Sequence, residues 1–305
     1  MVVLESIVPV LILILFGGAL ARTRFFGDSF FKDLNRLTYF WGLPSLLVYK
    51  VAEIDLRSEA GLGLLYTMLI VIGASIALAY ALVFILKVPR ESVGAFVQGS
   101  YRGNLAFVGF PVVYFALGQE GLDLGMFTSG ICILIYNTSS VAILILHSKD
   151  QGTGSPLQAI WKHGLSNPLI LACCLGFALN LADLEIPVMA RRALVAVGQI
   201  ALPLALIGLG AGLKLDELKG RLSFSIVASL INVAFSPLLG YYVGRSLGLD
   251  ADSLKVAVIF LACPTAVFSY VLAEMLGNDA VTARNIVILS TLLSIASLVI
   301  AIALV

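Results

Sequence analysis

Inside one long apolar run lies a stretch that mixes glycine, proline and polar residues, and it reads Gly99-Ser100-Tyr101-Arg102-Gly103-Asn104-Leu105-Ala106-Phe107-Val108-Gly109-Phe110-Pro111. Proline cannot donate a backbone hydrogen bond and clashes with the preceding helical turn. Glycine is a poor residue in the middle of a helix. We therefore expect a membrane-spanning helix that breaks here, near the middle of the bilayer. Irregular backbone at that depth is tolerated only where protein covers it or where it lines a wet cavity.

Arg102 is the ionisable residue of this stretch. An ionisable side chain inside a membrane indicates a functional site by default. The alternative is a helix that kinks only for packing, with the long Arg102 side chain reaching out to an interface. Features of the second half of the chain, described below, favour the functional interpretation.

The composition is that of a polytopic α-helical membrane protein. The chain has 305 residues, of which 60% are hydrophobic and only 12% are charged. Several apolar runs reach the roughly 20 residues that a helix needs to cross the hydrocarbon core. A net charge of +1 gives no electrostatic reason to bind nucleic acid. The four cysteines lie in apolar segments without the spacing of disulfides or metal ligands.

No motif of an enzyme is present. The sequence has no set of His, Asp or Glu residues at metal-ligand spacing and no phosphate-binding loop. The serine of Gly99–Gly103 does not occupy the position that a nucleophile elbow requires. We therefore expect no catalytic residues, no metal site and no cofactor.

Ten candidate spans can be drawn along the chain, at about 2–21, 37–52, 62–86, 93–117, 124–146, 168–184, 193–213, 222–247, 254–276 and 283–305. A polar stretch from His147 to His163 separates the fifth from the sixth. We accordingly divide the chain into a first five-helix repeat at 1–147, a cytoplasmic linker at 148–163 and a second five-helix repeat at 164–305.

The two halves have matching interruptions. An odd number of spans in each half places the halves in opposite orientations. The second span of each half contains a proline, Pro44 or Pro203, and the fourth is interrupted at 103–111 or at Pro264. Interrupted segments at corresponding positions of inverted halves indicate a transporter binding site. The predicted fold is all-α, with ten transmembrane helices in two inverted five-helix repeats and with fourth and ninth helices that break and cross.

Lysine and arginine in the connections predict the orientation, because cytoplasmic loops are enriched in both. Alternate connections carry twelve of these residues on one side of the membrane and six on the other. The richer side includes the linker. We therefore expect a multi-pass protein of the cell membrane with a cytoplasmic linker and with both termini outside the cytoplasm.

The polar residues of the broken spans are the candidates for substrate binding. The positive N-terminal ends of half-helices at a crossing suit a carboxylate. Asn104 lies beside the break and either binds such a group or satisfies orphan backbone carbonyls. Asn137 belongs with Tyr136 to a polar cluster of the fifth span, and it either binds substrate or links two helices. Ser45 follows Pro44, where packing is the simpler explanation.

These residues resemble the auxin efflux carrier family, whose fold is similar to that of bile acid:sodium symporters. The run Asn104 to Pro111 resembles the fourth-helix pattern of that family, an asparagine followed by a Gly-x-Pro break. The pair Cys263-Pro264, with the run to Leu276, resembles its ninth-helix proline crossover. The resemblance covers the whole chain in span count, linker and breaks, and the sequence is identified as a prokaryotic member. It implies that the crossing is formed by Gly103, Gly109, Pro111, Pro264 and Thr265.

The resemblance also implies a mechanism. A scaffold domain of helices 1, 2, 6 and 7 supports a transport domain of helices 3–5 and 8–10, which moves like an elevator. The implied substrates are organic anions, auxins in plants and small carboxylates in prokaryotes, and we expect a homodimer in the lipid bilayer. Substrate-binding roles carry over to Asn104, Asn137 and Ser45. We also expect Arg102 and Tyr136, which lie beside them in the sequence, to bind substrate. The family pattern does not settle what Arg102 does.

The leading hypothesis is a secondary transporter of small organic anions that needs no sodium. The guanidinium of Arg102 is always charged and should repel a cation placed near it. One alternative is a sodium-coupled symporter with a cation site built from Thr265, Ser269 and backbone oxygens. A second is a ligand sensor on the same fold, although no soluble signalling domain follows. A cation antiporter is disfavoured because no aspartate or glutamate lies in the middle of a span.

Overall fold

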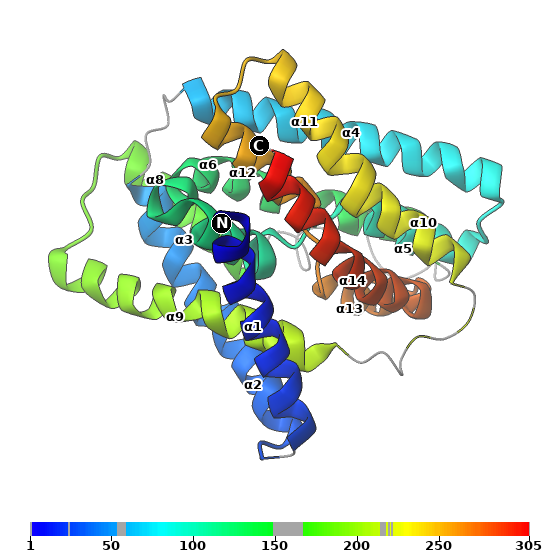
Figure 1. The fold of residues 1–305 in the computed structure, drawn as a ribbon, viewed down its shortest axis with the longest axis horizontal. Coiled ribbons are helices and arrows are strands. Elements are labelled where there is room, and N and C mark those ends of the chain that lie inside the picture. Colours follow the sequence, from blue (N-terminus) through cyan, green and yellow to red (C-terminus); the bar gives the residue numbers. More distant parts are fainter. Residues whose placement is uncertain are drawn as a thin grey trace.

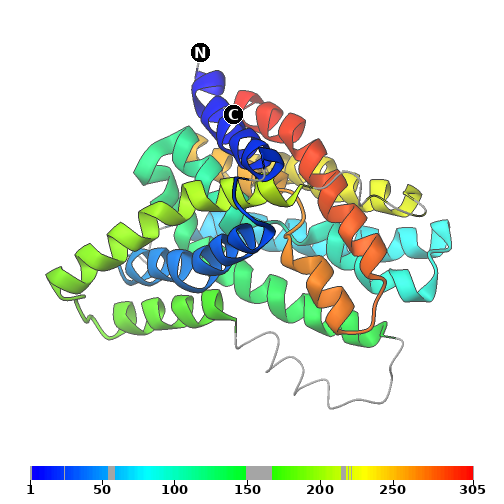
Figure 2. The same ribbon diagram turned by 90° about the horizontal axis from the view of Figure 1, so that it is seen from below.

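The computed structural model describes residues 2–23, 25–53, 59–148, 167–213, 218, 220 and 222–304 (Figures 1 and 2). All regular secondary structure in those residues is helical. Five helices are long and apolar enough to cross a membrane, namely Gly61–Leu86, Leu105–Leu146, Val188–Gly212, Ser223–Ser246 and Ala280–Ala303. Shorter apolar helices occupy Val8–Thr23 and Pro168–Leu181. The chain is therefore a polytopic α-helical membrane protein, as its composition predicts.

The first two predicted spans are helical. Helix α1 covers Val2–Thr23. Helix α2 (Asp28–Leu37) continues through the π-helical turn η1 (Thr38–Gly42) into α3 (Leu43–Ala52). The second helical segment thus begins at Asp28, well before the predicted residue 37, because the amphipathic α2 precedes the more apolar part.

Two helices from the second half pack against this N-terminal group. Helix α8 covers Pro168–Leu181 and α9 covers Val188–Gly212. Helix α1 packs along α9, and α3 packs against both α8 and α9 (Figure 1). The contact between α1 and α9 needs glycine, since a Cβ atom on Gly17 would lie 2.0 Å from the carbonyl oxygen of Ile207. We call α1–α3, α8 and α9 the first helix group.

The remaining helices form the second helix group. From the first half these are α4 (Glu59–Leu86), α5 (Arg90–Tyr101), the π-helical turn η2 (Leu105–Gly109) and α6 (Phe110–Leu146). Within α6, Gly118 has a positive φ of 67°. This kink separates the end of the predicted fourth span from the fifth.

The second half contributes α10 (Ser223–Leu230), η5 (Ile231–Phe235), α11 (Ser236–Ser246), α12 (Ala251–Ala262), α13 (Phe268–Met275) and α14 (Ala280–Leu304). Helix α4 packs on α5, α6 and α11, while α14 packs on α10, α12 and α13. The rings of Phe96, Phe110 and Phe260 are fully buried in the core that results.

Three of the prolines follow π-helical turns. The turn η1 precedes Pro44, η2 precedes Pro111, and η5 precedes Pro237. In each case the backbone N–H of the residue before the proline donates to the carbonyl five residues back. The wider turn leaves room for the proline ring, which would clash in a regular α-helix. The helix therefore continues through each proline.

The expected interruptions at Pro44 and Pro203 are consequently wrong. Pro44 lies at the start of α3 and directly continues the helix from η1, and Pro203 lies inside the uninterrupted α9. In a lipid environment every backbone polar group must be bonded within the protein. Losing one hydrogen bond at a proline costs less than opening a whole helical turn, so a single proline does not break these helices.

The predicted linker falls almost wholly outside the described residues, which end at 148 and resume at 167. Several of the charged residues counted above, including Arg24, Arg57 and Lys214, also lie outside them. Figure 2 shows that α1 begins and α14 ends on one side of the molecule, while α6 ends and α8 begins on the opposite side.

Candidate functional site

The first break in the second helix group lies at 102–104. Helix α5 ends at Tyr101, and the Gly103 N–H donates to the Tyr101 carbonyl over 3.1 Å. Arg102, at φ −82° and ψ 87°, forms the inverse γ-turn between them. Pro111 was expected to form part of the break, but it lies inside α6, because η2 accommodates it.

The second break lies between α12 and α13. Helix α12 ends at Ala262 because Pro264 has no N–H to continue the ladder. A residue before proline is driven out of the helical region, and Cys263 is extended, at φ −62° and ψ 141°. The Cys263 thiol donates to the Ile259 carbonyl over 3.2 Å.

The two breaks pair with each other like two short strands. Gly103 and Thr265 form an antiparallel bridge. The Asn104 N–H donates to the Pro264 carbonyl over 2.8 Å, and the Ala266 N–H donates to the Arg102 carbonyl over 2.9 Å. Backbone N–H and carbonyl groups that have no helical partner at the breaks therefore bond to each other across the crossing.

Thr265 completes this backbone arrangement. Its hydroxyl donates over 2.7 Å to the carbonyl of Gly99, which the end of α5 leaves available. Its N–H donates over 3.0 Å to the hydroxyl of Ser290 on α14. Gly109 also lies at the crossing, since a Cβ atom there would come within 3.1 Å of the Phe260 ring.

Arg102 lies inside the protein. Its exposed fraction is 4%, and its Nη2 donates to Oδ1 of Asn137 over 2.8 Å. The alternative in which this side chain extends to an interface is therefore wrong. Within the described residues, Nη1 has no hydrogen-bond partner and no carboxylate lies within ion-pair distance of the guanidinium.

Asn137 connects Arg102 to a residue that the sequence analysis missed. Its Nδ2 donates to the carbonyl of Ile133 over 2.7 Å, and its Oδ1 also accepts from Nδ2 of Asn167 over 3.1 Å. Asn167 caps α8, because its Oδ1 accepts from the N–H of Leu169 over 2.9 Å. An asparagine before a proline at a helix start indicates a cap, and nothing in that pattern indicates the contact with Asn137.

Tyr39 is a second residue that sequence reasoning missed. It belongs to η1, is partly buried, and lies near Arg102 and the Asn167 side chain. Tyrosine is common in apolar segments, so its position alone gives no indication of this role.

The other predicted residues differ in their surroundings. Asn104 caps η2 by accepting from the Phe107 N–H over 3.3 Å, while its Nδ2 is buried without a partner in the described part of the chain. Tyr136 is buried, and its hydroxyl would lie 3.7 Å from a Cβ atom on Gly103. Ser45 is half-buried in α3, and no hydrogen bond between described residues joins it to this cluster.

The first break therefore presents hydrogen-bond donors without acceptors. Nη1 of Arg102 and Nδ2 of Asn104 are buried and have no partner among the described residues. A buried charge without a counter-charge is costly, and a buried donor without a partner also costs free energy. An anion with oxygen acceptors would relieve both costs, and a carboxylate matches the fork of a guanidinium.

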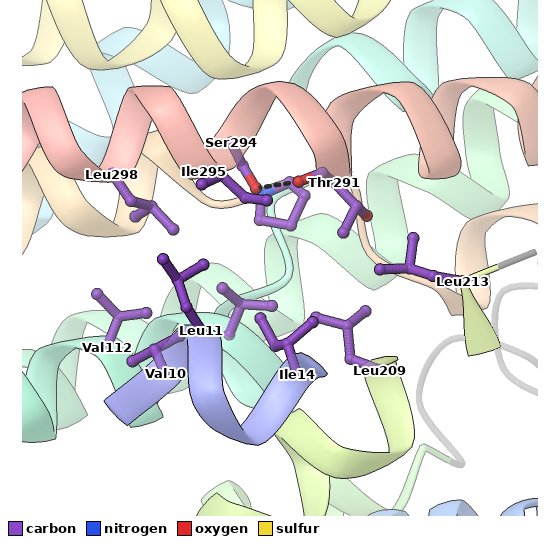
Figure 3. Close-up of a pocket in the computed structure, with 12 residues that line it drawn as sticks. Val10, Leu11, Ile14, Val112, Leu209, Leu213, Thr291, Ser294, Ile295 and Leu298 are labelled. Atoms are coloured by element: carbon purple, nitrogen blue, oxygen red, sulfur yellow. Dashed lines mark hydrogen bonds between the residues drawn. The ribbon is translucent and has the colours of Figure 1, made fainter. Parts of the chain in front are cut away.

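An apolar cavity of about 30 Å³ lies on another side of the crossing (Figure 3). It is lined by residues of α1, α9, η2, α6 and α14 and by Pro264. Its two hydroxyls, on Thr291 and Ser294, both donate to carbonyls of their own helix, at 2.6 and 2.8 Å. This cavity offers no donor to an anion, so the polar cluster at Arg102 is the better candidate site. Among the described residues, no group of three or more His, Cys, Asp or Glu could hold a metal ion.

Comparisons with known proteins agree with a transport function. A family model described as "Membrane transport protein" matches residues 2–302. An "Uncharacterized transporter" of Methanothermobacter thermautotrophicus is 26% identical, over 96% of this chain and 95% of its own length. An "Uncharacterized transporter" of Methanocaldococcus jannaschii is 23% identical, over 97% and 96%.

A bacterial protein is similar as well. The "Putative malonate transporter" of Rhizobium meliloti is 23% identical, over 87% of this chain and 83% of its own length. Archaeal and bacterial relatives fit a prokaryotic member of the family, and their names describe transporters rather than enzymes. The chain therefore belongs to the membrane transport protein family, which is the auxin efflux carrier family, and acts on a small-molecule substrate in a lipid membrane.

Proposed function

We propose that this protein is a secondary transporter of small organic anions, in which a substrate carboxylate binds to Arg102 and Asn104 beside the crossing. The observation that carries the proposal is the burial of Arg102 with no counter-charge among the described residues and with Nη1 unpartnered. Asn104, two residues along the chain, adds a second buried donor without a partner among the described residues. Both donors require an acceptor, and an anionic substrate supplies one.

Malonate is the first substrate to test. The proposal rests on chemistry that any small carboxylate shares, and the name of the Rhizobium meliloti relative gives one specific compound of this class. One carboxylate of malonate would take the donors of Arg102 and Asn104. The protein would then recognise the rest of the molecule by the shape of the site.

We further propose that ten helical spans form two inverted five-helix repeats that move as an elevator. The first helix group would be the scaffold domain and the second the transport domain. The most extensive helix contacts, such as those of α1 with α9 and of α11 with α12, lie within a group, which supports this division. The apolar cavity between α1, α9 and α14 lies where the two groups meet, as does the ion pair of Lys50 on α3 with Asp123 on α6.

The proposed orientation places both termini outside the cytoplasm and the linker inside it. In Figure 2 the start of α1 and the end of α14 lie on one side of the molecule, while the end of α6 and the start of α8, which flank the linker, lie on the other. This arrangement supports the proposed orientation. The connections on the same side as the linker carry the excess of lysine and arginine, and this excess identifies that side as the cytoplasmic one. The homodimer stays a prediction.

Arg102 replaces a coupling cation in this proposal. Its fixed positive charge offsets the charge of the substrate, so that the substrate gradient and the membrane potential drive transport without sodium. A sodium-coupled symporter is the second candidate, and one observation favours it. Oε1 of Gln98 and Oγ of Ser269 are buried near the second break without hydrogen-bond partners in the described residues, and oxygens are what a cation binds.

The test is uptake of labelled malonate by proteoliposomes that contain the purified protein, at fixed pH and membrane potential. We expect equal uptake in sodium, potassium and choline, and competition by other small carboxylates. A strict requirement for sodium would overturn the sodium-independent mechanism in favour of the symporter. Binding without uptake would indicate the sensor. Failure of malonate and of a panel of mono- and dicarboxylates to bind would overturn the organic-anion proposal.

A further inference from the structure

The amide of Asn137 is already engaged. Its oxygen accepts two hydrogen bonds, from Arg102 and Asn167, which fills both acceptor positions. Its nitrogen donates to the Ile133 carbonyl over 2.7 Å. The resemblance to the carrier family implies that Asn137 contacts substrate. In this structure the same side chain is the point where Arg102 and Asn167 meet.

We propose that Asn167 is a positioning residue for the Arg102 guanidinium, acting through the Asn137 amide; this inference rests on the proposed function. Asn167 is itself held in one orientation. Its oxygen accepts from the Leu169 N–H, so its nitrogen faces Asn137. Nη2 of Arg102 is thereby held by Asn137, and Nη1, which has no partner among the described residues, is left for the substrate.

The contact of Asn167 with Asn137 also joins the two helix groups. Asn167 begins α8 in the first group, while Asn137 and Arg102 belong to the second. All three side chains are buried, with exposed fractions of 7%, 5% and 4%. The anion site is therefore complete only in an arrangement that keeps α8 against α6. A movement of one group along the other would remove the support of Arg102 and favour release of the anion.

Two substitutions separate this role from helix capping. Asn167→Ser keeps a good cap for α8 but removes the amide donor to Asn137. Asn167→Asp also keeps the cap and replaces the donor by a carboxylate next to the Arg102–Asn137 pair. That carboxylate would pair with Arg102 and occupy the guanidinium in place of the substrate. Asn180→Ser is the matched control, because Asn180 lies at the other end of α8 and donates to the Ala52 carbonyl within the first group.

The first measurement is equilibrium binding of malonate to the full-length purified variants. We expect Asn167→Ser to weaken binding about tenfold, as for loss of one hydrogen bond to a charged network. The double variant Asn137→Ala, Asn167→Ser should bind no more weakly than Asn137→Ala alone, because both act through one contact. Asn167→Asp should weaken binding at least about a hundredfold, and Asn180→Ser should leave it unchanged. Unchanged affinity in Asn167→Ser, or strictly additive losses in the double variant, would overturn the inference.

The second measurement needs no ligand. Thermal unfolding in detergent compares Asn167→Asp in the natural background and in an Arg102→Gln background. We expect the aspartate to lower the unfolding midpoint strongly only when Arg102 is absent, because the new carboxylate is then buried without a partner. Equal shifts in both backgrounds would show that position 167 does not act on Arg102. This result stands whether or not malonate binds, so failure of the inference and failure of the proposed function are distinguishable.

Discussion

The two breaks that cross in this molecule have the same backbone role and different side-chain chemistry. At the second break, the polar side-chain groups of Cys263 and Thr265 donate to helix carbonyls. At the first break, Arg102 and Asn104 keep one donor each without a partner in the described residues. The second break completes the backbone of the crossing, and the first retains the groups that can recognise a substrate.

This difference has a physical origin. Pairing two extended segments inside a membrane requires only backbone N–H and carbonyl groups. Small side chains such as those of Cys263, Thr265 and Ala266 allow the close approach, and the Cys263 thiol and Thr265 hydroxyl each donate to a helix carbonyl. Because the crossing is stable through its backbone, Arg102 and Asn104 need not contribute their side chains to it. Three substitutions test whether the two breaks differ in this way.

Arg102→Gln should have the largest effect, a loss of malonate affinity of at least about a hundredfold. The reason is that removing one partner of a buried charge pair costs several kcal/mol. Equilibrium binding to the purified variant measures it, with size-exclusion chromatography as the check on folding. Arg102→Lys should retain part of the affinity, because lysine keeps the charge but lacks the fork that serves Asn137 and the anion together. Normal binding by a folded Arg102→Gln protein would contradict the site.

Asn104→Ser should have an intermediate effect, a tenfold to hundredfold loss of affinity. Serine keeps an oxygen that can cap η2, as Oδ1 does now for the Phe107 N–H, so the substitution removes mainly the unpartnered Nδ2. A lost hydrogen bond to a buried group costs about 1–3 kcal/mol. Titration of malonate by isothermal calorimetry checks the expected loss. If the variant binds normally, the Asn104 amide is structural, and recognition rests on Arg102 alone.

Thr265→Val should have the smallest effect on binding and a clear one on stability. Valine has nearly the same shape but cannot donate to the Gly99 carbonyl, which costs about 1–3 kcal/mol when the group stays buried. We expect a thermal midpoint several degrees lower in detergent and unchanged malonate affinity per folded molecule. Thr265→Ser should restore the midpoint. A large loss of affinity at unchanged stability would show that the second break takes part in recognition, and the contrast between the breaks would fail.

Much of the fold and part of the site could be predicted from the sequence. The apolar runs indicated the helical spans, and the mixture of glycine, proline and polar residues located a break between residues 99 and 111. Arg102 and Asn104 stood out because an ionisable or amide group is rare in such a run. The exact position of the break did not follow, because Pro111, like Pro44, is accommodated by a π-helical turn whose formation depends on the packing around it.

Hydrophobicity and backbone chemistry act locally along the chain, so the sequence is enough to predict a polytopic helical membrane protein with a polar, charged interruption in its fourth span. The packing of the helices is needed to show that Gly103 meets Thr265, that Arg102 lies inside, and that Asn167 contacts Asn137. Those contacts join residues tens of positions apart. A hydrogen bond depends on distances of a few tenths of an ångström and on direction, and these are set by how the helices pack rather than by the order of the residues.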